Sequence, residues 1–184
     1  MSNANSDRRS WVLAALDRFE GRLVRYSARL LADEEAARDV VQHAFLRLCD
    51  QSPEKLAGRE AAWLYTVCRN KALDLLRRQS QRGGSSPEGD EGRLGAAESA
   101  EPNPAQLAEA EELHAVLHGL VGELPRSQRE MVELWSQGVA YAEIAEITGV
   151  SVGNARVTVH RAIARLRNHP QVRRLLLEEE TINE

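Results

Sequence analysis

Apolar residues recur at intervals of three and four along most of this chain, the spacing that places side chains on one face of a helix. The first predicted helix spans about 11–31. Its apolar face consists of Ala15, Phe19, Leu23, Tyr26 and Leu30. A second helix follows to about Cys49, with Asp33 as its N-cap, and a third covers about 60–78. Residues 50–59, which include Pro53 and Gly58, predict a loop between them.

Helical spacing returns after residue 103. Asn103 and Pro104 are a typical cap and first-turn pair, so the next helix is predicted over about 105–121. Its expected buried residues are Leu107, Leu113, Val116, Leu117 and Leu120. Another helix is predicted from Pro125 to near Gly138. Its expected core residues are Met131, Val132, Leu134 and Trp135.

Residues 141–167 predict two helices joined by a tight turn. Ile144, Ala145 and Thr148 have helical spacing, Gly149 can turn the chain, and Ser151 can cap the next helix. The apolar face of that helix consists of Val152, Ala155, Val159, Ala162 and Leu166. Its other side carries Arg156, Arg161, Arg165 and Arg167, and no acidic residue occurs from 151 to 168. This pattern suits a recognition helix in a DNA major groove; the alternative is a helical hairpin with a solvated basic face.

The composition changes between the two helical blocks. Residues 79–103 are rich in Gly, Ser and acidic residues and poor in apolar ones, so they predict a mobile linker. Aromatic residues make up only 4% of the chain, and runs of β-branched residues are short. The predicted fold is therefore all-α, with two small helical domains joined by a flexible acidic linker and a helix-turn-helix in the second.

The net charge of −4 does not exclude a nucleic-acid partner. Acidic residues concentrate in 88–112 and 178–184, whereas the predicted helices at 59–82 and 151–168 are basic. Because a phosphate backbone responds to local charge, the distribution matters more than the total.

Several other classes of protein are disfavoured. No apolar stretch reaches 18 residues, so no membrane insertion is expected, and the start MSNANSDRRS lacks the apolar core of a secretion signal. Cys49 and Cys68 are interpreted as small core residues, with a redox switch between them as the alternative. His114 and His118 have metal-ligand spacing, but no further ligands accompany them. The chain also lacks a nucleophile motif and a Gly-rich phosphate loop, so we expect neither an enzyme nor a bound cofactor or metal.

Two segments resemble a known family. The stretch DEEAARDVVQHAFLRLCD (33–50), followed by AWLYTVCRNKALDLLRRQ (62–79), resembles region 2 of the extracytoplasmic-function (ECF) sigma factors of the sigma-70 family. Residues 124–167, with an LPRSQRE start and an HRAIARLR end, resemble region 4 of the same proteins. The resemblance implies region 2 over 10–80, a linker over 81–103, region 4 over 104–168 and a C-terminal tail over 169–184. The tail either continues the last helix or has a regulatory role.

A strip on the second helix is the candidate polymerase contact. Asp39, Gln42 and Phe45 lie at i, i+3 and i+6, so they share one side of the helix. The resemblance implies that this strip docks on the clamp of the largest polymerase subunit. His43 stands where the family commonly has glutamate. The alternative is a solvated polar face with Phe45 in the core.

The resemblance implies that the third helix and the loop before it read the promoter's −10 element as separated single strand. Loop residues 52–59 would form the wall of a pocket for an extruded base, although they contain no aromatic ring. The polar residues of the third helix in this role are Arg69, Asn70, Lys71, Asp74, Arg77 and Arg78. An extruded base needs a stacking surface as well as hydrogen-bonding partners. Trp63 or Tyr65 is the candidate for stacking, with a core role for Trp63 as the alternative.

The helix after the tight turn is the candidate reader of the −35 element. The resemblance places on that duplex Ser151, Gly153, Asn154, Arg156, Val157, His160 and Arg161. Arginine can pair with both major-groove acceptors of guanine, so Arg156 and Arg161 are the best candidates for base reading. Val157 and Thr158 replace a Ser-Arg pair common in the family, and Ala140 stands where the family has a Ser or Thr cap.

These features together predict a promoter-specificity subunit that binds core RNA polymerase and helps to melt the −10 region. The resemblance implies four partners: the clamp of the largest polymerase subunit, the flap of the second-largest subunit, promoter DNA and an anti-sigma factor. The expected location is the bacterial cytoplasm, in association with the nucleoid when the protein is active. The alternative function is a stand-alone helix-turn-helix regulator, although no ligand, receiver or dimerisation module is evident in the sequence.

Overall fold

The computed structural model describes residues 2–56, 58–81 and 104–175. Most of the predicted linker therefore lies outside the described residues, as does the Asn103 cap. The described chain forms the helices α1 (Ser2–Leu31), α2 (Glu34–Cys49), α3 (Pro53–Leu56), α4 (Glu60–Gln81), α5 (Pro104–Gly122), α6 (Arg126–Ser136), α7 (Tyr141–Thr148) and α8 (Val152–Arg167). The all-α prediction is confirmed, since this part of the chain contains no strand.

The described residues group into two compact units. The first contains α1 to α4 together with residues 142–149, and the second contains α5, α6, Tyr141, α8 and the segment that follows α8. No helix in the described residues is both long and apolar enough to cross a membrane. The domain limits drawn from the sequence remain predictions.

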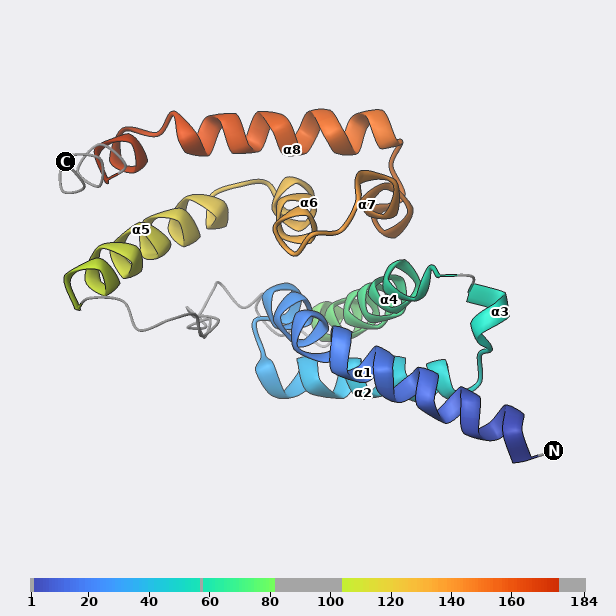
Figure 1. Cartoon of the computed structure of the whole chain (residues 1–184). Coiled ribbons are helices and arrows are strands. Elements are labelled where there is room, and N and C mark those ends of the chain that lie inside the picture. Colours follow the sequence, from blue (N-terminus) through green and yellow to red (C-terminus); the bar gives the residue numbers. More distant parts are fainter. Residues whose placement is uncertain (1, 57, 82–103, 176–184) are drawn as a thin grey trace. The chain divides into compact units, whose positions relative to one another are not determined.

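In the first unit, α1, α2 and α4 pack against one another (Figure 1). Each helix contributes its apolar stripe to a common core. The largest buried side chains are Leu23 and Tyr26 of α1, Val40 and Leu48 of α2, and Leu64, Tyr65 and Cys68 of α4. The rings of Tyr26 and Tyr65 meet edge to face, with centroids 5.1 Å apart and planes at 81°. Such aromatic pairs add about 0.5–1.5 kcal/mol beyond the area they bury, so this contact joins α1 firmly to α4.

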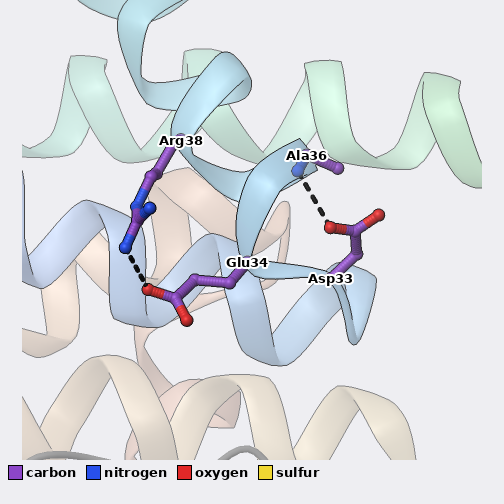
Figure 2. Close-up of polar contacts among 4 residues, drawn as sticks. All are labelled: Asp33, Glu34, Ala36 and Arg38. Carbon is purple, nitrogen blue, oxygen red and sulfur yellow. Dashed lines mark hydrogen bonds and ion pairs between the residues drawn. The ribbon is translucent and has the colours of Figure 1, made fainter.

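The start of α2 is determined by its own sequence, as Figure 2 shows. Asp33 is the N-cap, and its Oδ1 accepts a hydrogen bond from the backbone N–H of Ala36 over 3.0 Å. Glu34 and Glu35 occupy the first turn, where the helix dipole favours negative charge. Glu34 also pairs with Arg38 one turn later. The predicted cap is confirmed.

Some helix limits differ from those predicted. α1 begins at Ser2 rather than near residue 11, and α4 continues to Gln81 rather than ending near Arg78. Both added stretches are polar, so they carry no apolar periodicity, but they contain no proline or glycine to stop a helix. The predicted loop 50–59 contains the short helix α3, whose first residue is Pro53, a position that proline suits.

In the second unit, α6 packs against α8, and α5 also contacts α8. Leu124, Val132 and Ala162 form the centre of this core, with Ile163 packed against it. Met131 and Leu134 are buried as predicted. Trp135 is not: it lies in the last turn of α6 and is 40% exposed. The predicted α5 residues Leu113, Val116, Leu117 and Leu120 are only half-buried, and the side chain of Leu107 lies outside the description.

The predicted helix, turn and second helix occur at residues 141–167. Gly149 has φ +76°, a conformation that costs glycine little. The Ser151 hydroxyl accepts a hydrogen bond from the N–H of Asn154 over 3.2 Å and so caps α8. Of the predicted apolar face of α8, Ala155, Val159, Ala162 and Leu166 are buried. Val152 is 44% exposed, because it lies in the first turn at the edge of the packed face.

The segment after α8 does not continue that helix. α8 ends at Arg167 with Asn168 as C-cap, and a new helical segment occupies residues 170–175. Val172 and Leu175 in this segment are buried. Arg174 lies 3.8 Å from a carboxylate oxygen of Glu112 on α5. Residues 176–184 of the predicted tail lie outside the described residues.

The two cysteines occupy different environments. Cys68 is buried in the core of the first unit, as predicted, and burial raises the pKa of its thiol to about 12. Cys49 is exposed at the last position of α2, so its assignment to the core was wrong. Helical spacing alone did not exclude it, because Cys49 follows buried Phe45 by four residues and so lies at the edge of the apolar face.

Candidate nucleic-acid and partner interfaces

The exposed side of α8 carries the residues predicted to read duplex DNA. Because Ala155, Val159 and Ala162 are buried, the remaining side of the helix faces solvent. All seven predicted residues are exposed there: Ser151, Gly153, Asn154, Arg156, Val157, His160 and Arg161. An exposed helix with arginines and no acidic residue matches the width and potential of a major groove. The structure therefore gathers these residues on one accessible surface, which we call the α8 face.

Three side-chain contacts order the α8 face. The ring of Tyr141, the first residue of α7, stacks against the imidazole of His160, with centroids 6.0 Å apart and planes at 28°. The guanidinium carbon of Arg156 lies 5.6 Å from the centroid of the same ring. Farther along, Thr158 Oγ1 donates to Asn154 Oδ1 over 3.1 Å. Sequence reasoning missed Tyr141, because its helical position gives no sign that it reaches α8.

The C-terminal half of α4 forms a second exposed polar surface. Asn70, Asp74, Arg77 and Arg78 are exposed, and Arg69 and Lys71 are half-buried. Arg77 Nη1 lies 3.0 Å from Asp74 Oδ1, one turn earlier. Exposed pairs of this kind contribute about 0–1 kcal/mol, so Arg77 is readily redirected to a phosphate. Helix α4 thus presents several cations and an amide along one side, as expected for contacts with a nucleic-acid strand.

The structure separates the two candidates for base stacking. Tyr65 is buried against Tyr26, and burial raises the pKa of its phenol to about 12. Its ring is therefore part of the core and is not available to an extruded base. Trp63 is half-buried, so part of its indole reaches the surface of α4. Trp63 therefore remains the candidate for stacking with an extruded base.

The structure corrects one member of the predicted strip on α2: Phe45 is buried, and the neighbouring Leu46 is exposed instead. Asp39 and Gln42 are exposed and His43 is half-buried. Phe45 is only 7% exposed, so its ring belongs to the core, as the alternative interpretation held. Leu46, which sequence analysis did not select, is 62% exposed and follows Asp39 by seven residues, which places it on the same side. The surface available to a partner consists of Asp39, Gln42, His43 and Leu46; we call it the α2 strip.

The paired histidines of α5 lie against each other. The rings of His114 and His118 have centroids 6.4 Å apart and planes at 22°. Among the residues that the structure describes, no group of three or more His, Cys, Asp or Glu side chains is arranged to hold a metal ion. The geometry adds no third ligand to the pair.

Comparison with known protein families identifies two sigma-70 regions in this chain, the same two that the sequence resembles. Residues 15–82 match sigma-70 region 2, and residues 114–166 match region 4 of the sigma-70 proteins. The first match contains α2, α3 and α4, and the second contains α6, α7 and nearly all of α8. The α2 strip and the polar side of α4 therefore lie in the first region, and the α8 face lies in the second.

Several characterised proteins resemble the chain over most of its length. It is 32% identical over 145 residues to the ECF RNA polymerase sigma-E factor of Escherichia coli K12, covering 74% of this chain and 75% of that protein. It is 29% identical over 171 residues to the ECF sigma factor SigL of Mycobacterium tuberculosis, covering 91% of this chain and 93% of the relative. It is 31% identical over 150 residues to the ECF sigma factor SigE of Mycolicibacterium smegmatis. That match covers 80% of this chain but only 57% of the mycobacterial protein.

Proposed function

We propose, because this chain belongs to the extracytoplasmic-function group of the sigma-70 family, that it binds core RNA polymerase and directs it to specific promoters. In this role the chain is a transcription initiation factor, with no catalytic chemistry of its own. The chemistry of RNA synthesis belongs to the polymerase, and this chain supplies the recognition of DNA.

The observation that carries the proposal is the presence of two different exposed basic surfaces, one in each sigma region. The α8 face offers arginines to duplex base edges, so we assign it to the −35 element. The side of α4 that carries Asn70, Arg77 and Arg78 offers an amide and cations, so we assign it to the −10 element where the strands part. A half-buried Trp63 supports this division, since an unpaired base needs an aromatic surface on which to stack.

We assign the α2 strip to the clamp of the largest polymerase subunit. An exposed leucine beside an aspartate and a glutamine fits a helical partner that offers both an apolar stripe and polar groups. The second sigma region would contact the flap of the second-largest subunit. We also propose that an anti-sigma factor covers these surfaces and holds the chain inactive. The proposed location is the bacterial cytoplasm, in association with the nucleoid when the protein is active.

The competing function is a stand-alone regulator that uses the same α8 face. The two functions differ in what the isolated chain does. A sigma factor has a short basic surface in each half, so by itself it should bind duplex DNA weakly, with promoter specificity appearing only in the holoenzyme. A stand-alone regulator should bind its operator specifically without polymerase.

The test measures binding of the purified full chain to labelled duplex promoter fragments, with and without core polymerase, at one stated salt concentration. In the presence of polymerase, we expect specific binding that competitor DNA of unrelated sequence does not remove, together with run-off transcription from a defined start. Equal affinity and specificity without polymerase would reject the proposal in favour of a stand-alone regulator. The oligomeric state gives a second measure, since a dimer on a palindromic site would also favour the regulator.

A further inference from the structure

The ring of Tyr141 contacts two residues of the α8 face at once. Its centroid lies 5.6 Å from the Arg156 guanidinium carbon and 6.0 Å from the His160 ring centroid. Arg156 and His160 are one turn apart on α8, so a single ring spans both. Tyr141 is half-buried, whereas Arg156 and His160 are exposed. The half-buried ring of Tyr141 thus lies against two exposed side chains, those of Arg156 and His160.

This arrangement limits the freedom of Arg156. A solvent-exposed arginine samples many rotamers, and that freedom is lost when two N–H groups of its guanidinium donate to O6 and N7 of a guanine. An aromatic face attracts a guanidinium within about 6 Å and so favours the rotamers that keep the two in contact. Because the Tyr141 ring already restricts Arg156 in the free protein, Arg156 loses less side-chain conformational entropy when it binds DNA. The imidazole of His160 stacks against the same ring, so Tyr141 restricts both side chains.

We propose that Tyr141 is a positioning residue for duplex recognition: its ring orients Arg156 and His160 on the α8 face and thereby sharpens base preference at the pair that Arg156 reads. The inference rests on the proposed function, because it requires the α8 face to contact promoter duplex. It adds a residue of α7 to the determinants of promoter choice, although Tyr141 itself need not touch a base. The expected ligand is a guanine edge in the major groove.

The experiment uses holoenzyme assembled from core polymerase and the full chain, with a promoter library whose upstream element is randomised. Transcribed templates are sequenced to give base preference at each position. Arg156→Ala identifies the pair that Arg156 reads, as the position at which preference flattens. We expect Tyr141→Leu, which fills space but has no π face, to weaken preference at that same position about two- to fivefold. Tyr141→Phe retains the ring and should keep most of the preference.

Two controls separate positioning from a role in folding. Thermal unfolding of the free proteins should give similar midpoints for the Leu and Phe variants of Tyr141. In a chain that already carries Arg156→Ala and His160→Ala, Tyr141→Leu should cause no further loss at the identified position, because the groups that it orients are absent. Unchanged preference in Tyr141→Leu, or an equal loss at every position, would overturn the inference. A wild-type holoenzyme that selects no upstream sequence would instead overturn the proposed function itself.

Discussion

The hydroxyl of Thr158 donates a hydrogen bond to the side-chain oxygen of Asn154, 3.1 Å away and one turn earlier on α8. An asparagine amide has one oxygen that accepts and one nitrogen that donates, and either can face a base edge. Because Thr158 engages the oxygen, the amide nitrogen is left to donate toward the groove. In the proposed contact with DNA, Thr158 would therefore select the hydrogen-bonding group that Asn154 presents.

The first prediction is that Thr158→Val changes base preference next to Asn154. Valine keeps the β-branched shape but cannot donate, so the amide is free to rotate and to offer its oxygen instead. A hydrogen bond of this kind contributes about 0.5–1.5 kcal/mol, which predicts roughly a two- to tenfold loss of discrimination at one position. The measurement is promoter selection by the holoenzyme on a randomised upstream element. Thr158→Ser retains the hydroxyl and serves as the control; identical preferences for the Val and Ser variants would contradict the prediction.

The second prediction concerns the α2 strip and core polymerase. Leu46→Ser, or Asp39→Ala combined with Gln42→Ala, should weaken the affinity for core polymerase, because these side chains are exposed in the free chain. Their exposure also means that the free energy of unfolding should change by less than about 0.5 kcal/mol. Affinity is measured by titrating labelled chain with core polymerase, and the fold is checked by circular dichroism.

A matched control for Leu46 lies on α1. Leu13 is 53% exposed, comparable with the 62% of Leu46, but it is outside the α2 strip. Leu13→Ser should therefore leave polymerase affinity unchanged while making the same chemical change. If both serine variants lose affinity equally, general loss of apolar surface rather than a specific strip is responsible, and the assignment is wrong.

The third prediction separates the two DNA-facing surfaces by the state of the DNA that each binds. Arg156→Ala and Arg161→Ala remove contacts to intact duplex, and loss of one bidentate guanine contact costs about 1–3 kcal/mol. Asn70→Ala, Arg77→Ala and Arg78→Ala remove contacts where the strands part. A promoter already melted around its −10 element should partly rescue the α4 variants, because less strand separation is then required. The α8 variants should gain less, since their target is still duplex.

Run-off transcription on matched and pre-melted templates measures the rescue, and permanganate footprinting reports strand opening directly. Arg9→Ala provides a control, because Arg9 is an exposed cation of α1 in the same unit and belongs to neither surface. It should behave as the unchanged protein on both templates. Equal rescue of the α4 and α8 variants would show that the two surfaces do not divide the work in this way.

The fourth prediction follows from burial of Cys68. With a pKa of about 12, roughly one thiol in 10⁴ is ionised at pH 8, and the side chain is also buried. Iodoacetamide should therefore modify exposed Cys49 in the folded chain and reach Cys68 only after urea is added. Peptide mass spectrometry locates the label, and Cys49→Ser provides the control with no rapidly labelled thiol. Rapid modification of Cys68 in the folded protein would contradict the burial.

The raised pKa of Cys68 also predicts how stability depends on pH. In the unfolded chain the thiol loses its proton near its ordinary pKa of 9.0, while in the folded chain it keeps the proton until about pH 12. The folded state therefore binds more protons between these values, so the free energy of unfolding should fall as pH rises from about 9 to 12. Tyr65 acts in the same direction from its ordinary value of 10.0 to about 12. Urea unfolding at pH 8 and pH 10 measures the change; equal stability at both would contradict it.

Much of this protein was determined by local sequence. Asp33 and Ser151 cap α2 and α8 at the predicted residues, and Gly149 takes the positive φ of the turn, because each depends only on groups a few residues away. Helical spacing likewise identified the buried faces of α2 and α8 and therefore their exposed sides. The two sigma regions and the residues expected to face DNA on α8 were predicted from the chain alone.

Tertiary structure decided the cases in which periodicity allows more than one outcome. An apolar residue at the edge of a helix stripe is buried only if a neighbouring helix reaches it, so Phe45 entered the core while Trp135 did not. The same reason placed Cys68 inside and Cys49 outside. The contact of Tyr141 with Arg156 and His160 joins side chains that lie far apart in the sequence, and no helical repeat within either segment encodes it. Helical spacing in the sequence determined which side of each helix is exposed. Packing between helices determined which individual side chains at the edges and ends of those sides are exposed or buried.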